Sequence, residues 1–115
     1  MSNMKNSVLL IGNLGGDPVL SELTNGGKLT RLSLATNEYY RNKGGEMVEK
    51  TEWHRCIAWG KLAVRMRDKL SKGKKVAVCG KLTYRSYEDK EGKQRTLSQV
   101  EVQEYTILDK QEPQA

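Results

Sequence analysis

Turn signals divide this chain into pieces of strand length, and their order limits the folds that it can adopt. Gly, Asn, Asp and Pro cluster between runs with strand-like composition, which is the pattern of a sheet protein. In the run from 28 to 41, Leu32 and Leu34 alternate with Arg31 and Ser33, as in an antiparallel sheet with one half-exposed face. The expected strands cover about residues 5–14, 28–41, 46–59, 74–87 and 95–108, with a short extended piece at 19–23.

One segment has helical instead of strand periodicity. Leu62, Met66 and Leu70 recur every four residues and make one apolar stripe, and Gly73 is well placed to end the helix. We expect a helix over residues 61–70, with Met66 packing in the core. Three strands, one helix and two strands predict an all-β protein with one helix: a five-stranded Greek-key OB-fold barrel, with the helix between strands 3 and 4. A β-sandwich fragment and an SH3-like barrel are the competing folds.

The chain has 115 residues, enough for one compact domain, and it contains no Phe. Leu, Val and Ile must therefore carry the core. We expect one domain over residues 1–108 and a short disordered tail over 109–115. The net charge is +6, and residues 41–95 alone hold 16 Lys or Arg against 7 Asp or Glu. This excess of positive charge favours a polyanionic partner.

The segment from residue 51 to 63 contains both tryptophans and the only histidine, together with Arg55 and Lys61. On an extended strand without a bulge, Trp53, Arg55 and Trp59 share one face with Ile57 between them. Large flat rings beside positive charges suit a surface that stacks unpaired bases and neutralises their phosphates. The ordinary alternative is that both indoles are buried in the core.

Residue types that support catalysis or metal binding are scarce. His54 is the only imidazole, Cys56 and Cys79 lack metal-site spacing, and no phosphate-loop motif follows the early glycines. We therefore expect no enzyme activity, no metal and no cofactor, and we interpret both cysteines as reduced and buried. With no signal peptide and no long apolar run, a cytoplasmic protein without membrane contact is the expectation.

Several strings of this sequence occur together in one known family. They are VLLIGNLGGDP at 8–18, NGG at 25–27, LSLATNE at 32–38, TEWHR at 51–55 and GKLA at 60–63. In this order, over residues 4–108, the chain resembles the bacterial single-stranded DNA-binding proteins. The resemblance implies an OB-fold that wraps single-stranded DNA without sequence preference, in replication, recombination and repair, as a homotetramer.

The resemblance also implies roles for individual residues. Tyr stands at two stacking positions where the family usually has Trp, and its smaller ring offers less stacking area. The implied stacking residues are Trp53, Trp59, Tyr40 and Tyr87. The implied cations on the DNA path are Arg41, Lys43, Arg55, Lys61, Lys72 and Arg85. His54 matches a histidine at a contact between subunits. Of the adjacent Tyr39 and Tyr40, one is expected to face inward and the other, Tyr40, outward.

The end of the sequence departs from the family pattern. The acidic tip that family members usually carry is missing from residues 109–115, which puts recruitment of replication and repair proteins in doubt. One alternative function is therefore an accessory OB-fold assembly factor in replication restart. The other is an RNA-binding OB module of the cold-shock kind, against which the absence of Phe argues.

Overall fold

The computed structural model describes residues 5–108, and these form six strands and one helix. The strands are β1 (Val8–Leu14), β2 (Val19–Glu22), β3 (Lys28–Arg41), β4 (Met47–Trp59), β5 (Lys75–Glu88) and β6 (Gln94–Ile107), and the helix is α1 (Gly60–Lys69). The expected domain over residues 1–108 stays a prediction, and it includes all of the described residues. The expected tail, residues 109–115, lies outside them.

Five of the six strands close into a barrel. The hydrogen-bonded order is β1-β5-β6-β4-β3-β2, and a further pairing between β1 and β3 completes the circle. That closing contact is short, with Asn13 opposite Ala35 and Leu14 opposite Leu34. β4 and β6 run parallel, and all other pairs are antiparallel. With α1 following the third barrel strand, this arrangement confirms the OB-fold and excludes the competing folds.

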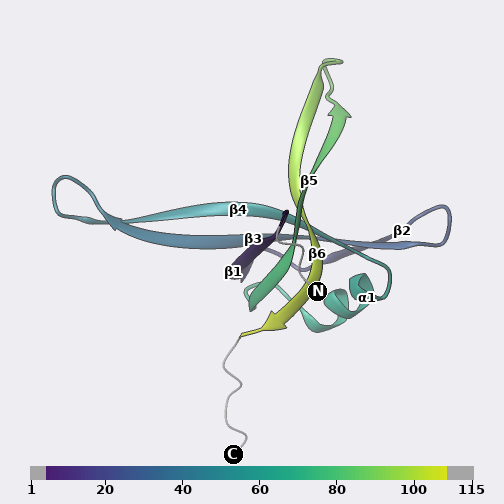
Figure 1. The fold of residues 1–115 in the computed structure, drawn as a ribbon, viewed down its shortest axis with the longest axis horizontal. Helices are drawn as coiled ribbons and strands as arrows, with labels where there is room; N and C mark the ends of the chain where they lie inside the picture. The colour runs from purple at the N-terminus through teal and green to yellow at the C-terminus, as the bar shows by residue number, and fades with distance from the viewer. Residues whose placement is uncertain (1–4, 109–115) are drawn as a thin grey trace, which may run out of the picture.

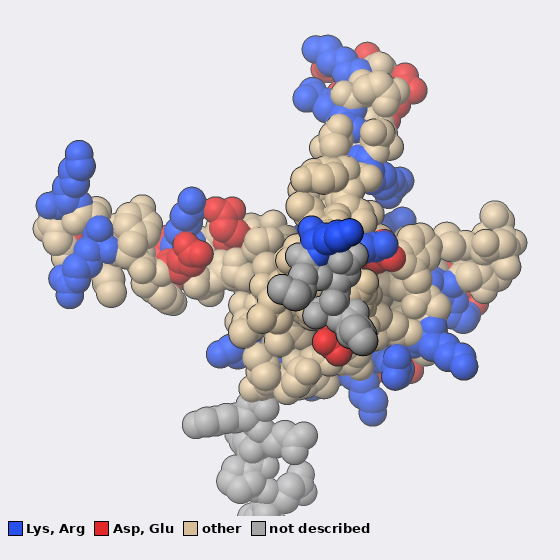
Figure 2. Space-filling model, viewed as in Figure 1, with Lys and Arg blue, Asp and Glu red and all other residues tan. Residues whose placement is uncertain are grey.

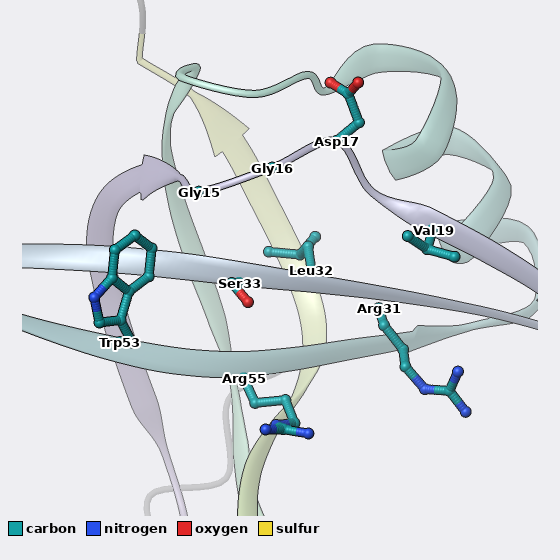
Figure 3. Close-up of a pocket in the computed structure, with 9 residues that line it drawn as sticks. All are labelled: Gly15, Gly16, Asp17, Val19, Arg31, Leu32, Ser33, Trp53 and Arg55. Carbon is teal, nitrogen blue, oxygen red and sulfur yellow. The ribbon is translucent and has the colours of Figure 1, made fainter.

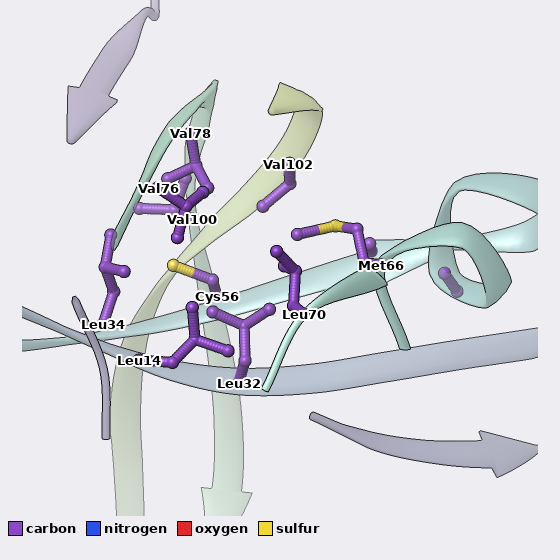
Figure 4. Close-up of a cluster of buried hydrophobic side chains, with 12 residues drawn as sticks. Leu14, Leu32, Leu34, Cys56, Met66, Leu70, Val76, Val78, Val100 and Val102 are labelled. Atoms are coloured by element: carbon purple, nitrogen blue, oxygen red, sulfur yellow. The ribbon is translucent and has the colours of Figure 1, made fainter. Parts of the chain in front are cut away.

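Mainly aliphatic side chains fill the barrel, and Ala63 and Met66 of α1 pack into this core (Figure 4). Leu34, Met66, Val76 and Val78 are completely buried. The hydroxyl of Thr30, also buried, donates a hydrogen bond of 2.7 Å to the carbonyl of Ala63 and so ties β3 to the helix. Met66 packs in this core as expected, which shows how a chain without Phe fills its interior.

Two long hairpins leave the barrel as arms (Figure 1). β3 and β4 stay paired from Leu29–Trp59 as far as Arg41–Met47, and β5 and β6 stay paired out to Glu88–Gln94. A strand of 14 residues spans about 46 Å at 3.3 Å per residue, more than the barrel needs. The outer half of each arm therefore has no core beneath it.

The structure corrects two expectations about burial. Tyr39 and Tyr40 are both exposed, because the arm that carries them has solvent on each side. Cys56 is buried as expected, whereas Cys79 is only half-buried on β5; both are unpaired. Differences in the strand bounds are small, the largest being a first strand that begins at Val8 instead of residue 5.

Candidate nucleic-acid interface

Three hollows on the outer face of β3 and β4 meet at Arg55, and together we call them the Arg55 groove. The first hollow, of about 430 Å³, is lined by Gly15, Gly16, Asp17, Val19, Arg31, Leu32, Ser33, Trp53 and Arg55. The second, of about 250 Å³, is lined by Ser33, Trp53, His54, Arg55, Leu82, Leu97, Ser98, Gln99 and Val100. The third, of about 260 Å³, is lined by Leu23, Leu29, Arg31, Arg55, Ile57, Trp59, Arg85, Leu97 and Gln99.

The strand register explains why these residues share one face. β4 pairs with β3 without a bulge, so that Trp53 stands opposite Ala35, Arg55 opposite Ser33 and Trp59 opposite Leu29. Because alternate side chains point to opposite faces, the odd-numbered positions of both strands look outward and the even-numbered ones inward. The expected shared face of Trp53, Arg55, Ile57 and Trp59 is therefore confirmed, although Ile57 is buried there.

Trp53 lines both the first and the second hollow and is open to solvent, with 63% of its surface exposed. Figure 3 shows it beside the loop that holds Gly15 and Gly16, with Arg31 and Arg55 reaching along the same face. Its six-membered ring lies against Gly15, where an added Cβ would come within 3.0 Å of Cη2 and closer still to Cζ3. The backbone of Gly15 therefore supports the indole ring, and the absence of a side chain at this position makes room for it.

Trp59 lies at the other end of the groove, in the third hollow, and is 44% exposed. It is the last residue of β4 and the N-cap of α1, so its backbone is fixed by both elements. The two tryptophans therefore stand on one face with Arg55 between them. This is the arrangement needed to stack successive bases while a cation neutralises the backbone.

Three guanidinium groups line the third hollow. Arg31, Arg55 and Arg85 come from β3, β4 and β5, and within residues 5–108 none has an acidic group at ion-pair distance. Uncompensated positive charge in a concave surface concentrates anions there. Arg31 was missed as a site residue, although its position on the polar face of β3 was a signal that could have identified it.

The β5–β6 arm adds Arg85 and Tyr87 to the site. Arg85 stands opposite Leu97 and Tyr87 opposite Arg95, so both face the side on which Leu97 and Gln99 line the groove. Tyr87 is exposed. The structure therefore brings Arg85 together with Trp59 and places Tyr87 further out along the same face.

The β3–β4 arm places Tyr40 differently from Trp53. Tyr39, opposite Glu49, is four residues from Ala35 and shares its face with Trp53, whereas Tyr40, opposite Val48, is on the reverse face. Both rings are exposed. Tyr39 was missed as a candidate, because adjacent positions of a strand were assumed to lie over a core.

Arg41 and Lys43 sit at the tip of this arm, in a turn organised by Asn42. The Asn42 carboxamide oxygen accepts hydrogen bonds from the backbone N–H groups of Gly44 at 2.9 Å and Glu46 at 3.0 Å. Its own N–H donates to the carbonyl of Glu46, and Gly45 adopts a φ of 80° that suits glycine. These hydrogen bonds organise the tip and leave Lys43 exposed.

The β5–β6 arm ends in a turn with the same hydrogen-bond pattern, in which the carboxylate of Asp89 takes the place of the Asn42 carboxamide. Asp89 Oδ1 accepts from the N–H groups of Glu91 and Lys93, both at 2.9 Å, and Gly92 has a φ of 82°. Asp89 Oδ2 also accepts a hydrogen bond of 2.8 Å from Arg95 Nε. The hydrogen bond from Arg95, followed by that from Lys93, lowers the pKa of Asp89 below its usual value.

Of the remaining expected residues, His54 lines one hollow of the Arg55 groove, whereas Lys61 and Lys72 lie outside it. Lys61 is in the first turn of α1, and Lys72 follows the helix, where its backbone N–H donates to Asp17 Oδ1 at 2.8 Å; neither lines the groove. His54 lines the second hollow with part of its surface, and its Nε2 is 2.9 Å from the hydroxyl of Thr36.

Within residues 5–108, no group of three His, Cys, Asp or Glu side chains is placed to hold a metal ion. Burial raises the pKa of the Cys56 thiol to about 12, which keeps it protonated at neutral pH. None of the helical segments in the described part of the chain has the length and apolar character of a membrane span.

Comparison with known proteins places this chain in a family. The sequence model described as the single-strand binding protein family matches residues 5–108. A curated relative, Single-stranded DNA-binding protein 1 of Chlorobaculum tepidum, is 43% identical over 89 residues, which cover 77% of this chain and 55% of the relative. This chain thus matches about half the length of that relative.

A solved structure has the same fold. The Plasmodium falciparum SSB, in complex with ssDNA, superposes with a TM-score of 0.81 at 32% sequence identity and covers 90% of this chain and 95% of its own. The match of the family model over nearly all described residues agrees with this likeness. The chain therefore belongs to the single-strand binding protein family.

Proposed function

We propose that this chain binds single-stranded DNA without sequence preference and protects it during replication, recombination and repair. The observation that carries the proposal is the open Arg55 groove, with an exposed indole on each side of an unpaired guanidinium. The relative from Chlorobaculum tepidum is named for single-stranded DNA binding, and the Plasmodium falciparum structure contains ssDNA. Both support the same ligand for this chain.

The position of the groove on the barrel supports the same proposal. OB-folds bind oligonucleotides on the face of their second and third strands, between the loops that join strands one to two and four to five. In this chain β3 and β4 are the second and third barrel strands. The groove lies on them, between the Gly15–Gly16 loop and the β5–β6 arm.

The mechanism has a stacking part and an electrostatic part. Each base stacked on an aromatic ring contributes about 1–3 kcal/mol, and every base has a face that can stack. Paired bases keep their faces covered, so this contribution selects unpaired strands. Lys and Arg release counterions from the phosphates, with a slope of log K against log salt of about −0.7 per neutralised phosphate. Neither part reads base edges, which removes sequence preference.

The proposed binding residues are those that the family resemblance implied, together with Arg31. The proposed stacking residues are Trp53, Trp59, Tyr40 and Tyr87. The proposed phosphate contacts are Arg31, Arg41, Lys43, Arg55, Lys61, Lys72 and Arg85.

The protein acts by stoichiometric binding without catalysis. By binding only the unpaired form, it shifts the melting equilibrium of hairpins by mass action. The proposed location of the protein is the bacterial cytoplasm, on the DNA of the nucleoid.

We further propose a homotetramer, with His54 at a contact between subunits. β1 offers a surface for association, because Leu9 and Ile11 are 67% and 52% exposed. Residues 8–11 pair with β5 on one edge, and because β1 pairs with β3 only at Asn13 and Leu14, their other edge has no strand partner in the described part of the chain. Unpaired strand edges readily pair with another chain. Light scattering should give four times the 13.0 kDa of one chain, and a monomer would exclude this assembly.

Competition binding tests the ligand. A labelled oligo-dT bound to the protein is challenged with unlabelled single-stranded DNA, duplex DNA and RNA of matched length and base composition. Single-stranded DNA should displace the label best, and duplex DNA should displace it least. Equal displacement by duplex DNA would contradict the stacking mechanism. Stronger displacement by RNA would favour the RNA-binding alternative.

A further inference from the structure

The exposed face of α1 carries a stripe of positive charge outside the Arg55 groove. Lys61, Arg65 and Lys69 recur every four residues and are all exposed, whereas Ala63 and Met66 face the core. Positions four apart lie on one side of a helix. The three cations therefore form one row, here called the α1 stripe. At 1.5 Å per residue it is about 12 Å long.

The N-terminal part of the α1 stripe is unfavourable for the helix itself, whereas Lys69 lies in the last turn, where the negative end of the helix dipole favours a cation. Like charges at positions i and i+4 destabilise a helix, and the stripe contains two such pairs. The helix N-terminus carries partial positive charge, yet Lys61 lies in the first turn and no acidic residue is there to compensate. Repulsion within the row, together with Lys61 at the positive end of the helix, would be relieved by an external anion.

No acidic side chain neutralises the α1 stripe within the described residues. The only acid of α1, Asp68, is 2.6 Å from Arg67, whose side chain is not part of the row. Lys61, Arg65 and Lys69 have no ion-pair partner between residues 5 and 108. Figure 2 shows Lys and Arg side chains gathered over α1 on the face that it displays.

The α1 stripe connects to the groove at both ends. It starts two residues after Trp59, which lines the third hollow. Beyond its other end, the backbone N–H of Lys72 donates to Asp17, which lines the first hollow. A strand that leaves the groove past Trp59 thus meets Lys61 first, then Arg65 and Lys69.

We propose that the α1 stripe binds the phosphate backbone of a single strand as it leaves the Arg55 groove, with Arg65 and Lys69 as phosphate contacts. The stripe offers no aromatic ring, so this segment is held by charge alone and adds salt dependence without base stacking. The proposal rests on the proposed function and extends its binding path by two residues beyond the contacts named there.

The test compares two double variants with the same loss of charge. Arg65→Gln with Lys69→Gln removes two cations of the stripe. Lys50→Gln with Arg67→Gln removes two cations that pair with Glu52 and Asp68, and serves as the control. Each is titrated with an oligo-dT of about 6 nucleotides and one of about 16, the range that one OB-fold covers, across a series of salt concentrations.

For the longer oligomer, the stripe variant should lose about 1.4 from the magnitude of the salt slope, at about 0.7 per lost phosphate contact. The ratio of the variant's affinity to that of wild type should then rise by about 25-fold as the salt concentration rises tenfold. The short oligomer should bind within about twofold of wild type, because the stacking rings keep it in the groove. The control variant should keep the wild-type slope.

Equal slopes for wild type and the stripe variant would overturn this proposal while leaving the proposed function intact. Failure of the wild-type protein to bind any single strand would instead reject the proposed function. The stripe variant should unfold at a temperature close to that of wild type, because loss of like-charge repulsion offsets loss of the favourable position of Lys69 in the last turn of the helix. Arg65→Lys with Lys69→Arg keeps the charge and should keep the slope; loss of slope there would also overturn the proposal.

Discussion

Trp53 of β4 rests on Gly15, which lies in the loop after β1 and is far from it in the sequence. The contact is so close that a side chain at position 15 has no room beside the ring. It holds one part of the indole against the backbone while 63% of the residue stays exposed. A supported but open ring is pre-organised for a stacking partner, because little side-chain freedom remains to be lost on binding.

Gly15→Ala should displace the Trp53 ring and weaken single-stranded DNA binding. The loss should not exceed about 1–3 kcal/mol, the contribution of one stacked base. Gly16→Ala is the matched control, since a Cβ there meets no atom within 4 Å. Oligo-dT titrations of the two variants make the comparison, and equal affinities would show that the ring needs no support from Gly15.

Trp53→Ala should weaken binding to oligo-dT, oligo-dA and oligo-dC by similar factors. Loss of one stacked base removes about 1–3 kcal/mol whichever base it is. Anisotropy titrations with the three labelled oligomers give the factors. A loss confined to one base would mean that Trp53 takes part in reading base edges.

Tyr40→Ala should weaken binding of long oligomers more than of short ones. Tyr40 is on the face of the arm opposite to Trp53, so a strand stacked on Trp53 reaches Tyr40 only by passing around the arm. Titrations with oligo-dT of increasing length show where the variant departs from wild type. Loss of affinity in Tyr39→Ala with none in Tyr40→Ala at any length would assign the stacking role to Tyr39.

The turn at Asp89 should loosen at acidic pH, whereas the turn at Asn42 should not. The pKa of Asp89 is lowered in the folded protein, so its contribution is present at neutral pH and is lost as the pH falls through that lowered pKa. Amide NMR signals of Glu91 and Lys93 should report the change, with Gly44 and Glu46 as the internal control. Asp89→Asn should remove the pH dependence of the turn, because an amide can accept the same two backbone hydrogen bonds. A turn at Asp89 that stays unchanged at acidic pH would contradict this assignment.

The fold could be predicted from the sequence because its signals are local. Turn residues such as Asn25 and Gly26, alternation along β3 and the Leu62–Met66–Leu70 stripe each specify one element within a few residues. The order of these elements then leaves few ways to close a barrel. Strand and helix bounds accordingly agree within a few residues.

The site was predictable only in part, because its details depend on where the core ends. Alternation says that Tyr39 and Tyr40 face opposite ways, but it cannot say that no core lies under either. The same limit applies to Ile57, which the strand pattern places on the open face and which the structure buries between neighbouring side chains. The contact between Gly15 and Trp53 joins segments that are distant in sequence and leaves no local signal.

The central claim is that Trp53 and Trp59 both stack on bases in the Arg55 groove. Because the chain has only two tryptophans, Trp53→Phe leaves Trp59 as the sole indole, and Trp59→Phe leaves Trp53. Indole emission of each variant is measured during titration with oligo-dT, while anisotropy of a labelled oligomer reports saturation independently. Quenching of both remaining indoles in step with saturation is the predicted result. Saturated binding with unchanged emission from either indole would contradict the claim.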